Sequence, residues 1–150
     1  LYVGAPNTEK DFSVFSEPIF KKCSNIHNLG FVDVSSKLFY DITAQCGYVI
    51  LPSSSEGCAT SVTTCMRRGL VPVVTKEVGL DIGDFGILVK DGTVESVQSA
   101  VKEAINISRV DFERRVRATY QESEKYTNLN FKKSFRDAIV SILKNKGFLV

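Results

Sequence analysis

The residues with the clearest chemical potential lie close together, in a polar stretch from Ser53 to Thr64. Glu56 supplies a carboxylate, and a carboxylate that accepts from polyol hydroxyls forms strong, charge-assisted hydrogen bonds. Thr60 and Thr64 are four residues apart, so their hydroxyls share one face of a helix. A carboxylate in a loop and a hydroxyl one turn into the following helix suit the two ends of one polyol phosphate.

Backbone amides at the start of the predicted helix add hydrogen-bond donors to this stretch. The amides of Gly57, Cys58, Ala59 and Thr60 fall where a helix leaves its first N–H groups without partners, which suits a phosphate. Gly57 has no side chain to block close approach, and Glu56 would lie near the positive end of the helix dipole. The spacing also fits an ordinary loop in which Glu56 and the serines only cap the helix, so spacing alone leaves both interpretations open.

Two apolar segments must position these residues. Tyr48–Leu51 is short and apolar, as a buried strand should be, and Pro52 ends it because proline cannot continue a central ladder. Gly69 ends the helix, and Val71–Thr75 forms the next strand. A strand, a short helix and a strand predict a parallel unit whose ligands bind beyond the carboxyl ends of the strands. The residues with helical spacing are Ala59, Val62, Cys65 and Met66.

Strands and helices alternate along the rest of the chain. We expect further strands at Leu1–Gly4, Ile26–Val32 and Gly86–Lys90, and further helices over Asp11–Cys23, from Ser35 or Ser36, from Thr93, from Asp111, and after Thr127–Asn130. This order predicts an α/β fold, a Rossmann-like parallel sheet covered by helices on both faces, with two extra helices at the end. The helix from Thr93 should bury Val94, Val97, Val101, Ala104 and Ile105.

The overall composition is that of an ordinary soluble domain. The 150 residues are 43% hydrophobic and 24% charged, and they form one domain by length. The net charge of +2 is too small to suggest a nucleic-acid partner. No apolar run approaches the ~20 residues of a membrane span, and no secretory signal opens the chain. A basic cluster near the end fits a solvated helix face, with contact to an anionic membrane surface as the alternative. Its members are Lys132, Lys133, Arg136, Lys144 and Lys146.

The cysteines and the single histidine give no sign of a metal site. The cysteines show no paired spacing, and His27 lies in an apolar strand context. Small buried thiols in a reducing cytoplasm are therefore expected, and no metal ligand is assigned. The cysteines are Cys23, Cys46, Cys58 and Cys65.

The central segment resembles a known family. LPSSSEGCATSVTTCMRRGLVPVVT is similar to the donor-binding segment of group 1 glycosyltransferases, the GT-B enzymes that use nucleotide sugars. That family has a strand ending in Pro-Ser, then Glu-Gly, a helix with alanine or cysteine before methionine, and Gly-x-Pro-Val-Val. Leu29–Val32 resembles the family's strand-end turn that meets the nucleotide base, and Gly86–Val89 resembles its Gly-Leu-Leu-Val strand.

The resemblance implies a role for each residue of the polar stretch. Glu56 would be the catalytic residue that contacts hydroxyls of the donor sugar. The amides of Gly57, Cys58, Ala59 and Thr60 would lie near the diphosphate and the sugar.

The resemblance also implies how the nucleoside is bound. Gly30, Phe31 and Val32 would meet the base. Thr64 falls where many relatives carry a second glutamate that holds the ribose, so this chain departs from the family pattern there. A threonine offers one hydrogen bond but cannot chelate a diol as a carboxylate does.

The resemblance predicts an incomplete enzyme. The chain opens on Leu1 within an expected strand, and Met66 is its only methionine. We therefore expect residues 1–150 to be a single donor-binding domain, a fragment that lacks its first strand and helix and the acceptor-binding domain before them. Alone it should not catalyse transfer.

The predicted function is that of the donor-binding half of a glycosyltransferase. It would move a hexosyl unit from a nucleotide-diphosphate sugar to a glycan, lipid or protein acceptor, with retention and without a metal or other cofactor. The location would be cytoplasmic, with peripheral contact to the inner face of the membrane as an addition. The alternatives are a non-catalytic GT-B-like binding module and a sugar-nucleotide epimerase.

Overall fold

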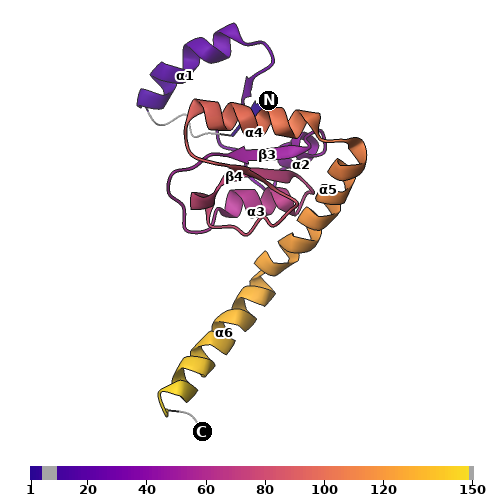
Figure 1. The fold of residues 1–150 in the computed structure, drawn as a ribbon. Helices are drawn as coiled ribbons and strands as arrows, with labels where there is room; N and C mark the ends of the chain where they lie inside the picture. Colours follow the sequence, from indigo (N-terminus) through magenta and orange to yellow (C-terminus); the bar gives the residue numbers. More distant parts are fainter. Residues whose placement is uncertain (5–9, 149–150) are drawn as a thin grey trace. The chain divides into compact units, whose positions relative to one another are not determined.

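The computed structural model describes residues 1–4 and 10–148. The chain forms two compact units, Leu1–Cys46 and Gly47–Val150, and each is described by itself (Figure 1). The prediction of one donor-binding domain over residues 1–150 stays a prediction.

The first unit contains a short parallel strand pair. β1 (Tyr2–Val3) pairs with β2 (His27–Asn28). The predicted strand Ile26–Val32 is wrong beyond Asn28, because Gly30 has a φ of 64° and turns the chain out of the extended conformation. Its amide donates to Asn28 Oδ1 at 3.2 Å, which fixes this turn.

Two helices complete the first unit. α1 (Lys10–Lys22) continues through Pro18, and α2 (Lys37–Thr43) follows a turn at Asp33. Ser36 is the N-cap of α2, since its side chain accepts from the Phe39 amide, as predicted.

The second unit is built on a three-stranded parallel sheet. β4 (Val71–Thr75) lies between β3 (Tyr48–Leu51) and β5 (Ile87–Val89). Every residue of β4 is buried, because this central strand is covered on both faces. The three strands predicted for this region are confirmed.

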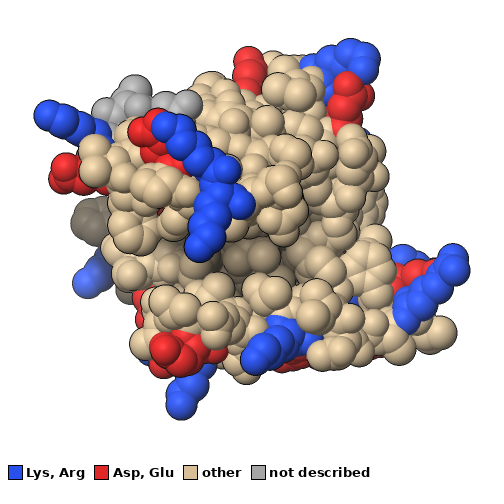
Figure 2. All heavy atoms as spheres, turned by 90° about the horizontal axis from the view of Figure 1, so that it is seen from above, with Lys and Arg blue, Asp and Glu red and all other residues tan. Residues whose placement is uncertain are grey.

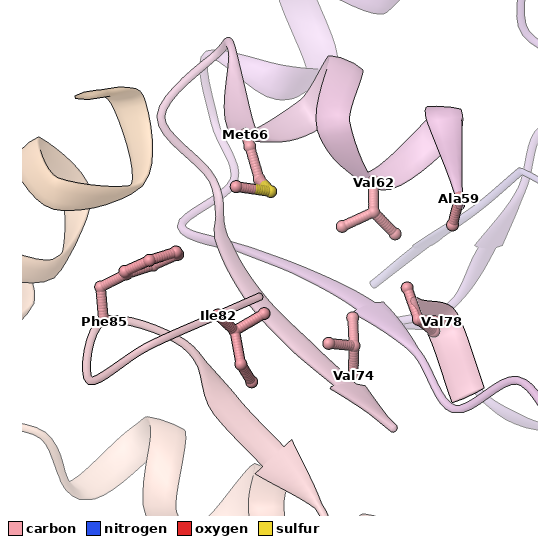
Figure 3. Close-up of a cluster of buried hydrophobic side chains, with 7 residues drawn as sticks. All are labelled: Ala59, Val62, Met66, Val74, Val78, Ile82 and Phe85. Carbon is pink, nitrogen blue, oxygen red and sulfur yellow. The ribbon is translucent and has the colours of Figure 1, made fainter. Parts of the chain in front are cut away.

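Helices cover both faces of this sheet, as predicted. α3 (Thr60–Met66) places Val62 and Met66 against Val74 and the loop after β4, and Figure 3 shows these side chains converging. On the other face, α4 (Val94–Asn106) packs against Val73, Ile87 and Val89. Val73 and Val74 are neighbours in β4, so their side chains point to opposite faces.

The buried face of α4 differs from the prediction. Val94 is 66% exposed and Ile105 is 73% exposed, whereas Ala100 and Ala104 are buried. Alanines let the helix backbone lie close to β4 and β5, so the contact face is centred on the small residues. The prediction is correct for Ala104, which is buried, and for Val97, which packs against the core, and it is wrong for Val94 and Ile105.

Two further helices end the second unit. α5 (Arg109–Ser123) is followed by the short 3-10 helix η2 (Glu124–Tyr126) and by α6 (Asn128–Asn145). The cap of α5 is Ser108, whose side chain accepts from the Asp111 amide, so the prediction of Asp111 as cap is wrong. Among the described residues, no helix is both long and apolar enough to cross a bilayer.

Candidate functional site

Three loops meet at one edge of the sheet in the second unit. Leu51 of β3 pairs with Val74, and Thr75 of β4 pairs with Val89. Because the strands are parallel, the residues that follow 51, 75 and 89 all leave the sheet at its carboxyl edge. The stretch Ser53 to Thr60 therefore lies where the sequence predicted it.

The loop between β3 and α3 is fastened to the segment that follows β4. The Thr75 hydroxyl donates to the Ser53 carbonyl at 2.5 Å. The Glu56 amide donates to the Glu77 carbonyl at 3.1 Å, and Glu77 belongs to the 3-10 helix η1 (Lys76–Val78). Hydrogen bonds of this kind contribute about 1 kcal/mol each. The loop is thus held in place before any ligand arrives.

One of the predicted phosphate donors is occupied. The Ala59 amide donates to the Val78 carbonyl at 3.3 Å, so the prediction that this amide lacks a partner is wrong. The Ala59 side chain is buried in the core beneath α3. The amides of Gly57, Cys58 and Thr60 form no hydrogen bond with any described residue. They remain the backbone donors that this loop offers.

The glycines at this edge play different roles. Gly79 has a φ of 73°, and a Cβ there would lie 2.5 Å from the Gly57 carbonyl oxygen, so the fold requires a glycine. Gly57 itself has no positive φ, and a Cβ there would meet no described atom within 4 Å. Packing in the described chain therefore gives no reason for a glycine at position 57, which faces open space.

The Glu56 side chain is exposed beside this open space. Among the described residues, no ion pair or hydrogen bond engages its carboxylate. The carboxylate can therefore accept from a hydroxyl-bearing ligand without first breaking an internal contact. Its assignment as the residue that contacts a sugar stays a prediction.

The Thr64 hydroxyl is partly committed within α3. It donates to the Thr60 carbonyl at 2.7 Å, and the Thr63 hydroxyl donates to the same oxygen at 3.0 Å. While this bond lasts, Thr64 can only accept a hydrogen bond from a ligand. Thr64 therefore offers a ligand an acceptor but no donor, and its assignment to the ribose stays a prediction.

The residues assigned to the nucleotide base belong to the first unit. Gly30 is buried, Phe31 is 85% exposed and Val32 is half-buried. They follow β2 after Leu29, so they occupy a strand-end turn as predicted. Their role stays a prediction.

Two lysines at the carboxyl edge were not predicted as site residues. Lys76 directly follows β4 and Lys90 directly follows β5, and both are exposed. Lys76 Nζ lies 3.7 Å from the Glu77 carboxylate. These two lysines could have been predicted from their positions, because each immediately follows a strand that ends at this edge of the sheet.

A carboxylate next to Lys90 stabilises the structure locally. Asp91 accepts from the Thr93 amide at 3.0 Å and from the Thr93 hydroxyl at 2.5 Å. Hydrogen bonds from the Ser96 and Thr93 side chains lower the pKa of Asp91 to about 2. Asp91 is therefore ionised at neutral pH and unsuited to act as a general acid.

The cysteines are free thiols, and none of them is buried. Cys58 is exposed and the other three are half-buried, so the expectation of buried thiols is wrong. Within the described ranges, no group of three or more His, Cys, Asp or Glu residues is placed to hold a metal ion.

Two solved structures resemble this chain. One is the crystal structure of WaaG, a glycosyltransferase involved in lipopolysaccharide biosynthesis, with a TM-score of 0.64 and 16% identity over 87% of this chain and 35% of that chain. The other is the catalytic domain of starch synthase IV from Arabidopsis thaliana, bound to ADP and acarbose. Its TM-score is 0.59, with 19% identity over 87% of this chain and 31% of that chain. No family model matches the sequence, and no curated protein matches it.

The likeness extends over most of this chain but over about a third of each of the two structures. At identities of 16% and 19%, the likeness to these two structures establishes the fold alone. The fold predicted from the sequence is confirmed: the chain has the Rossmann-like architecture of half of a GT-B glycosyltransferase.

Proposed function

We propose that this chain binds the donor in a glycosyltransferase that uses a nucleotide-diphosphate sugar. The reaction would move a hexosyl unit to a glycan, lipid or protein acceptor, with retention and without a metal. An acceptor-binding domain would be needed for transfer. We place the activity in the cytoplasm, where an exposed thiol such as Cys58 stays reduced.

The observation that carries this proposal is the open space at Gly57. A glycine that neither φ nor internal packing requires, in a loop fastened at both ends, fits a site where a ligand approaches the backbone closely. It lies at the carboxyl edge of a parallel sheet, which is where α/β proteins bind ligands.

The groups around Gly57 match the parts of a sugar diphosphate. The free amides of Gly57, Cys58 and Thr60 would donate to phosphate oxygens at the start of α3. The Glu56 carboxylate would accept from hydroxyls of the sugar and so orient the carbon that is transferred.

Cations at the same edge would assist departure of the nucleoside diphosphate. As the bond between the sugar and the diphosphate breaks, negative charge develops on the leaving phosphate. Lys76 and Lys90 leave the sheet at this edge, and both ammonium groups could stabilise that charge together with the amides. This arrangement would replace the metal that other transferases use.

The nucleoside would be held less firmly than in relatives with a second glutamate. Thr64 can accept one hydrogen bond from the ribose but cannot donate while it bonds to Thr60. Gly30, Phe31 and Val32 would contact the base.

Titration with nucleoside diphosphates tests the proposal. The starch synthase structure contains ADP, so ADP, UDP and GDP are the first probes. We expect saturable heat release by calorimetry for at least one of them, and weaker binding of the corresponding monophosphate. In the Gly57→Val variant the side chain would fill the open space and reduce diphosphate affinity at least tenfold, whereas Ser99→Val, at an exposed position of α4, serves as the control.

Sugar recognition is tested separately with the nucleotide sugar. We expect Glu56→Gln to weaken binding of the nucleotide sugar more than binding of the diphosphate, because only the sugar meets the carboxylate. Glu103→Gln, an exposed position on α4, is the matched control. Absence of binding for all three diphosphates would contradict the proposal.

The second candidate is a non-catalytic GT-B-like module that binds a nucleotide without transfer. The observation that favours it is the committed Thr64 hydroxyl, which leaves the ribose contact incomplete. A protein that joins this chain to an acceptor-binding domain decides between the two. Nucleotide binding without release of diphosphate from any common donor would support the module.

A further inference from the structure

The segment of residues 75–78, at the carboxyl edge of the sheet, is fixed at both of its ends. Val74, which precedes it in β4, and Val78, the last residue of η1, are both buried and belong to the core cluster beneath α3. Figure 3 shows their side chains pointing into that cluster. Gly79, with a φ of 73°, ends η1 directly afterwards. The core therefore holds this segment in one position.

Backbone hydrogen bonds hold the middle and the end of the neighbouring loop against this segment. The Glu56 amide donates to the Glu77 carbonyl at 3.1 Å, and the Ala59 amide donates to the Val78 carbonyl at 3.3 Å. Both bonds join backbone groups alone, so they do not depend on which side chains stand at these positions.

The start of the loop is held by a side chain instead. Strand pairing between β3 and β4 ends at Leu51 and Val74. Just beyond it, the Thr75 hydroxyl donates to the Ser53 carbonyl at 2.5 Å. Thr75 is 2% exposed, and the four residues before it in β4 are apolar. A valine would suit this strand and has nearly the same shape, but it could not donate. A buried hydroxyl is costly unless it forms a hydrogen bond, so this bond explains how a threonine is accommodated here.

The direction of the Glu56 carboxylate depends on how this loop is held. The side chain is exposed, and no ion pair or hydrogen bond with a described residue fixes it. The chain also offers little long-range charge to orient an anionic donor, because its net charge is +2 and Lys and Arg are interspersed with Asp and Glu over the face drawn in Figure 2. A donor sugar would therefore be oriented by groups that the backbone places, and Glu56 follows Ser53 closely in the chain.

We propose that Thr75 is a positioning residue for the donor sugar, because its hydroxyl holds the start of the loop so that Glu56 meets the sugar hydroxyls. This inference rests on the proposed function, in which Glu56 accepts from the sugar. Without the hydroxyl, the half-buried Ser53 carbonyl must turn toward water to regain a donor, and the loop moves with it. The loop position that suits the sugar is then only partly populated, and the apparent affinity falls by that fraction.

Substitution of Thr75 by valine and by serine tests this proposal. Thr75→Val keeps the shape and removes the donor, whereas Thr75→Ser keeps the donor and removes a buried methyl group. The probes are ADP-glucose, UDP-glucose and GDP-mannose, and calorimetry measures their affinity. We expect Thr75→Val to weaken binding about fivefold, which corresponds to about 1 kcal/mol, the usual net contribution of one hydrogen bond.

The serine variant separates positioning from general stability. Thr75→Ser should bind within about twofold of the wild-type chain because its hydroxyl still donates. Its urea midpoint should nevertheless fall, because a buried methyl group is lost. Unchanged affinity in Thr75→Val, or an equal loss of affinity in Thr75→Ser, would overturn the proposal.

A double-substitution cycle shows whether Thr75 acts through Glu56. In Glu56→Gln the contact with the sugar is already weakened, so the addition of Thr75→Val should cause a further loss of less than about twofold. Losses that multiply in the double variant would show that Thr75 does not act through Glu56, and the proposal would be wrong.

Thr119→Val is the matched control for a buried threonine. Thr119 lies on α5, is 0% exposed, and its hydroxyl has no hydrogen-bond partner among the described residues. The same substitution there removes no bond and should leave the affinity unchanged. An equal loss of affinity in Thr119→Val and Thr75→Val would contradict a specific role for Thr75.

Amide hydrogen exchange tests the loop without any ligand. Thr75→Val should speed exchange of the Glu56 and Ala59 amides about fivefold relative to the amides of β4, and Thr119→Val should not. Faster loop exchange in a chain that binds none of the nucleotide sugars would contradict the proposed function and support the hold of Thr75 on the loop. Nucleotide-sugar binding with unchanged loop exchange in Thr75→Val would overturn the role of Thr75 and leave the proposed function intact.

Discussion

α5 and α6 are consecutive helices in the second unit, and both carry basic and apolar residues, yet the protein uses them differently. α5 is anchored to the sheet: Arg115 donates to the carbonyl oxygens of Phe85 and Gly86, and Phe112 packs against Tyr48 with ring centroids 5.3 Å apart. α6 has no such anchor and buries none of its residues within the described chain. α5 therefore stabilises the fold, whereas the apolar face of α6 is exposed within the described chain.

Amphipathic spacing does not identify what a helix packs against. α5 has the less regular apolar pattern, but its Thr119 and Ser123 are buried against neighbouring elements. α6 has a clear face with Phe131 and Phe135, both exposed. Long-range partners, which spacing does not encode, decide which face is covered. Matched substitutions in the two helices test this difference.

The largest difference is expected for phenylalanine truncation. Phe112→Ala should lower the free energy of unfolding by about 2 to 3 kcal/mol, because it removes a half-buried ring that contacts Tyr48 and fills the space beside Gly47. Phe135→Ala should change it by less than about 0.5 kcal/mol. Urea unfolding monitored by circular dichroism measures both. Equal losses in the two variants would show that α6 is packed against the unit after all.

Arginine removal should give the next largest difference. Arg115→Gln would leave the carbonyls of Phe85 and Gly86 without this donor and Asp111 without one of its partners, so we expect a loss of about 1 to 2 kcal/mol. Arg136→Gln should be neutral within about 0.5 kcal/mol, because its guanidinium is exposed. The same urea experiment measures both variants. A stability change for Arg136→Gln as large as that for Arg115→Gln would contradict the comparison.

The local elements of the second unit could largely be predicted from the sequence. The apolar runs at Tyr48–Leu51 and Val71–Thr75, separated by a short helical pattern and bounded by Pro52 and Gly69, leave few arrangements other than a parallel strand–helix–strand unit. This order places the loop with Glu56 at the carboxyl edge. The location of the candidate site follows from local signals alone.

The predictions that were wrong depend on contacts between distant residues. The Ala59 amide is occupied because η1 runs beside the loop, and no spacing rule indicates that Val78 lies within reach of it. The buried side of α4 is centred on Ala100 and Ala104 because small residues permit close packing on the sheet. Hydrophobic periodicity gives more weight to the larger residues, so it pointed to Val94 instead.

Removal of the helix caps should have a smaller effect and should separate global from local stability. Ser108→Ala and Thr127→Ala each delete a side-chain acceptor for an amide of the first turn, which is worth about 1 kcal/mol. For α5 this loss should appear in global unfolding, because the helix is packed. For α6 it should appear as faster amide hydrogen exchange within the helix at unchanged global stability. A fall in global stability for Thr127→Ala would contradict this distinction between the packed helix α5 and the locally opening helix α6.

The pH dependence of α5 should be the smallest effect. Hydrogen bonds from Arg115 and then Arg114 lower the pKa of Asp111 below the ordinary value of 3.8 for an aspartate. A carboxyl with a lowered folded-state pKa contributes stability that is fully present above its unfolded-state pKa and is lost as pH falls through the folded-state value. The contribution of Asp111 should therefore be constant from neutral pH to about 4.5 and decline below that. In Asp111→Asn this part of the decline should be missing from urea midpoints measured between about pH 5 and pH 3.

Asp84 also pairs with Arg114, so Asp84→Asn is the control that separates the two carboxylates. If Asp111→Asn keeps the full acid dependence of the wild-type chain, the ion pairs of α5 do not anchor it, and its contrast with α6 rests on apolar packing alone.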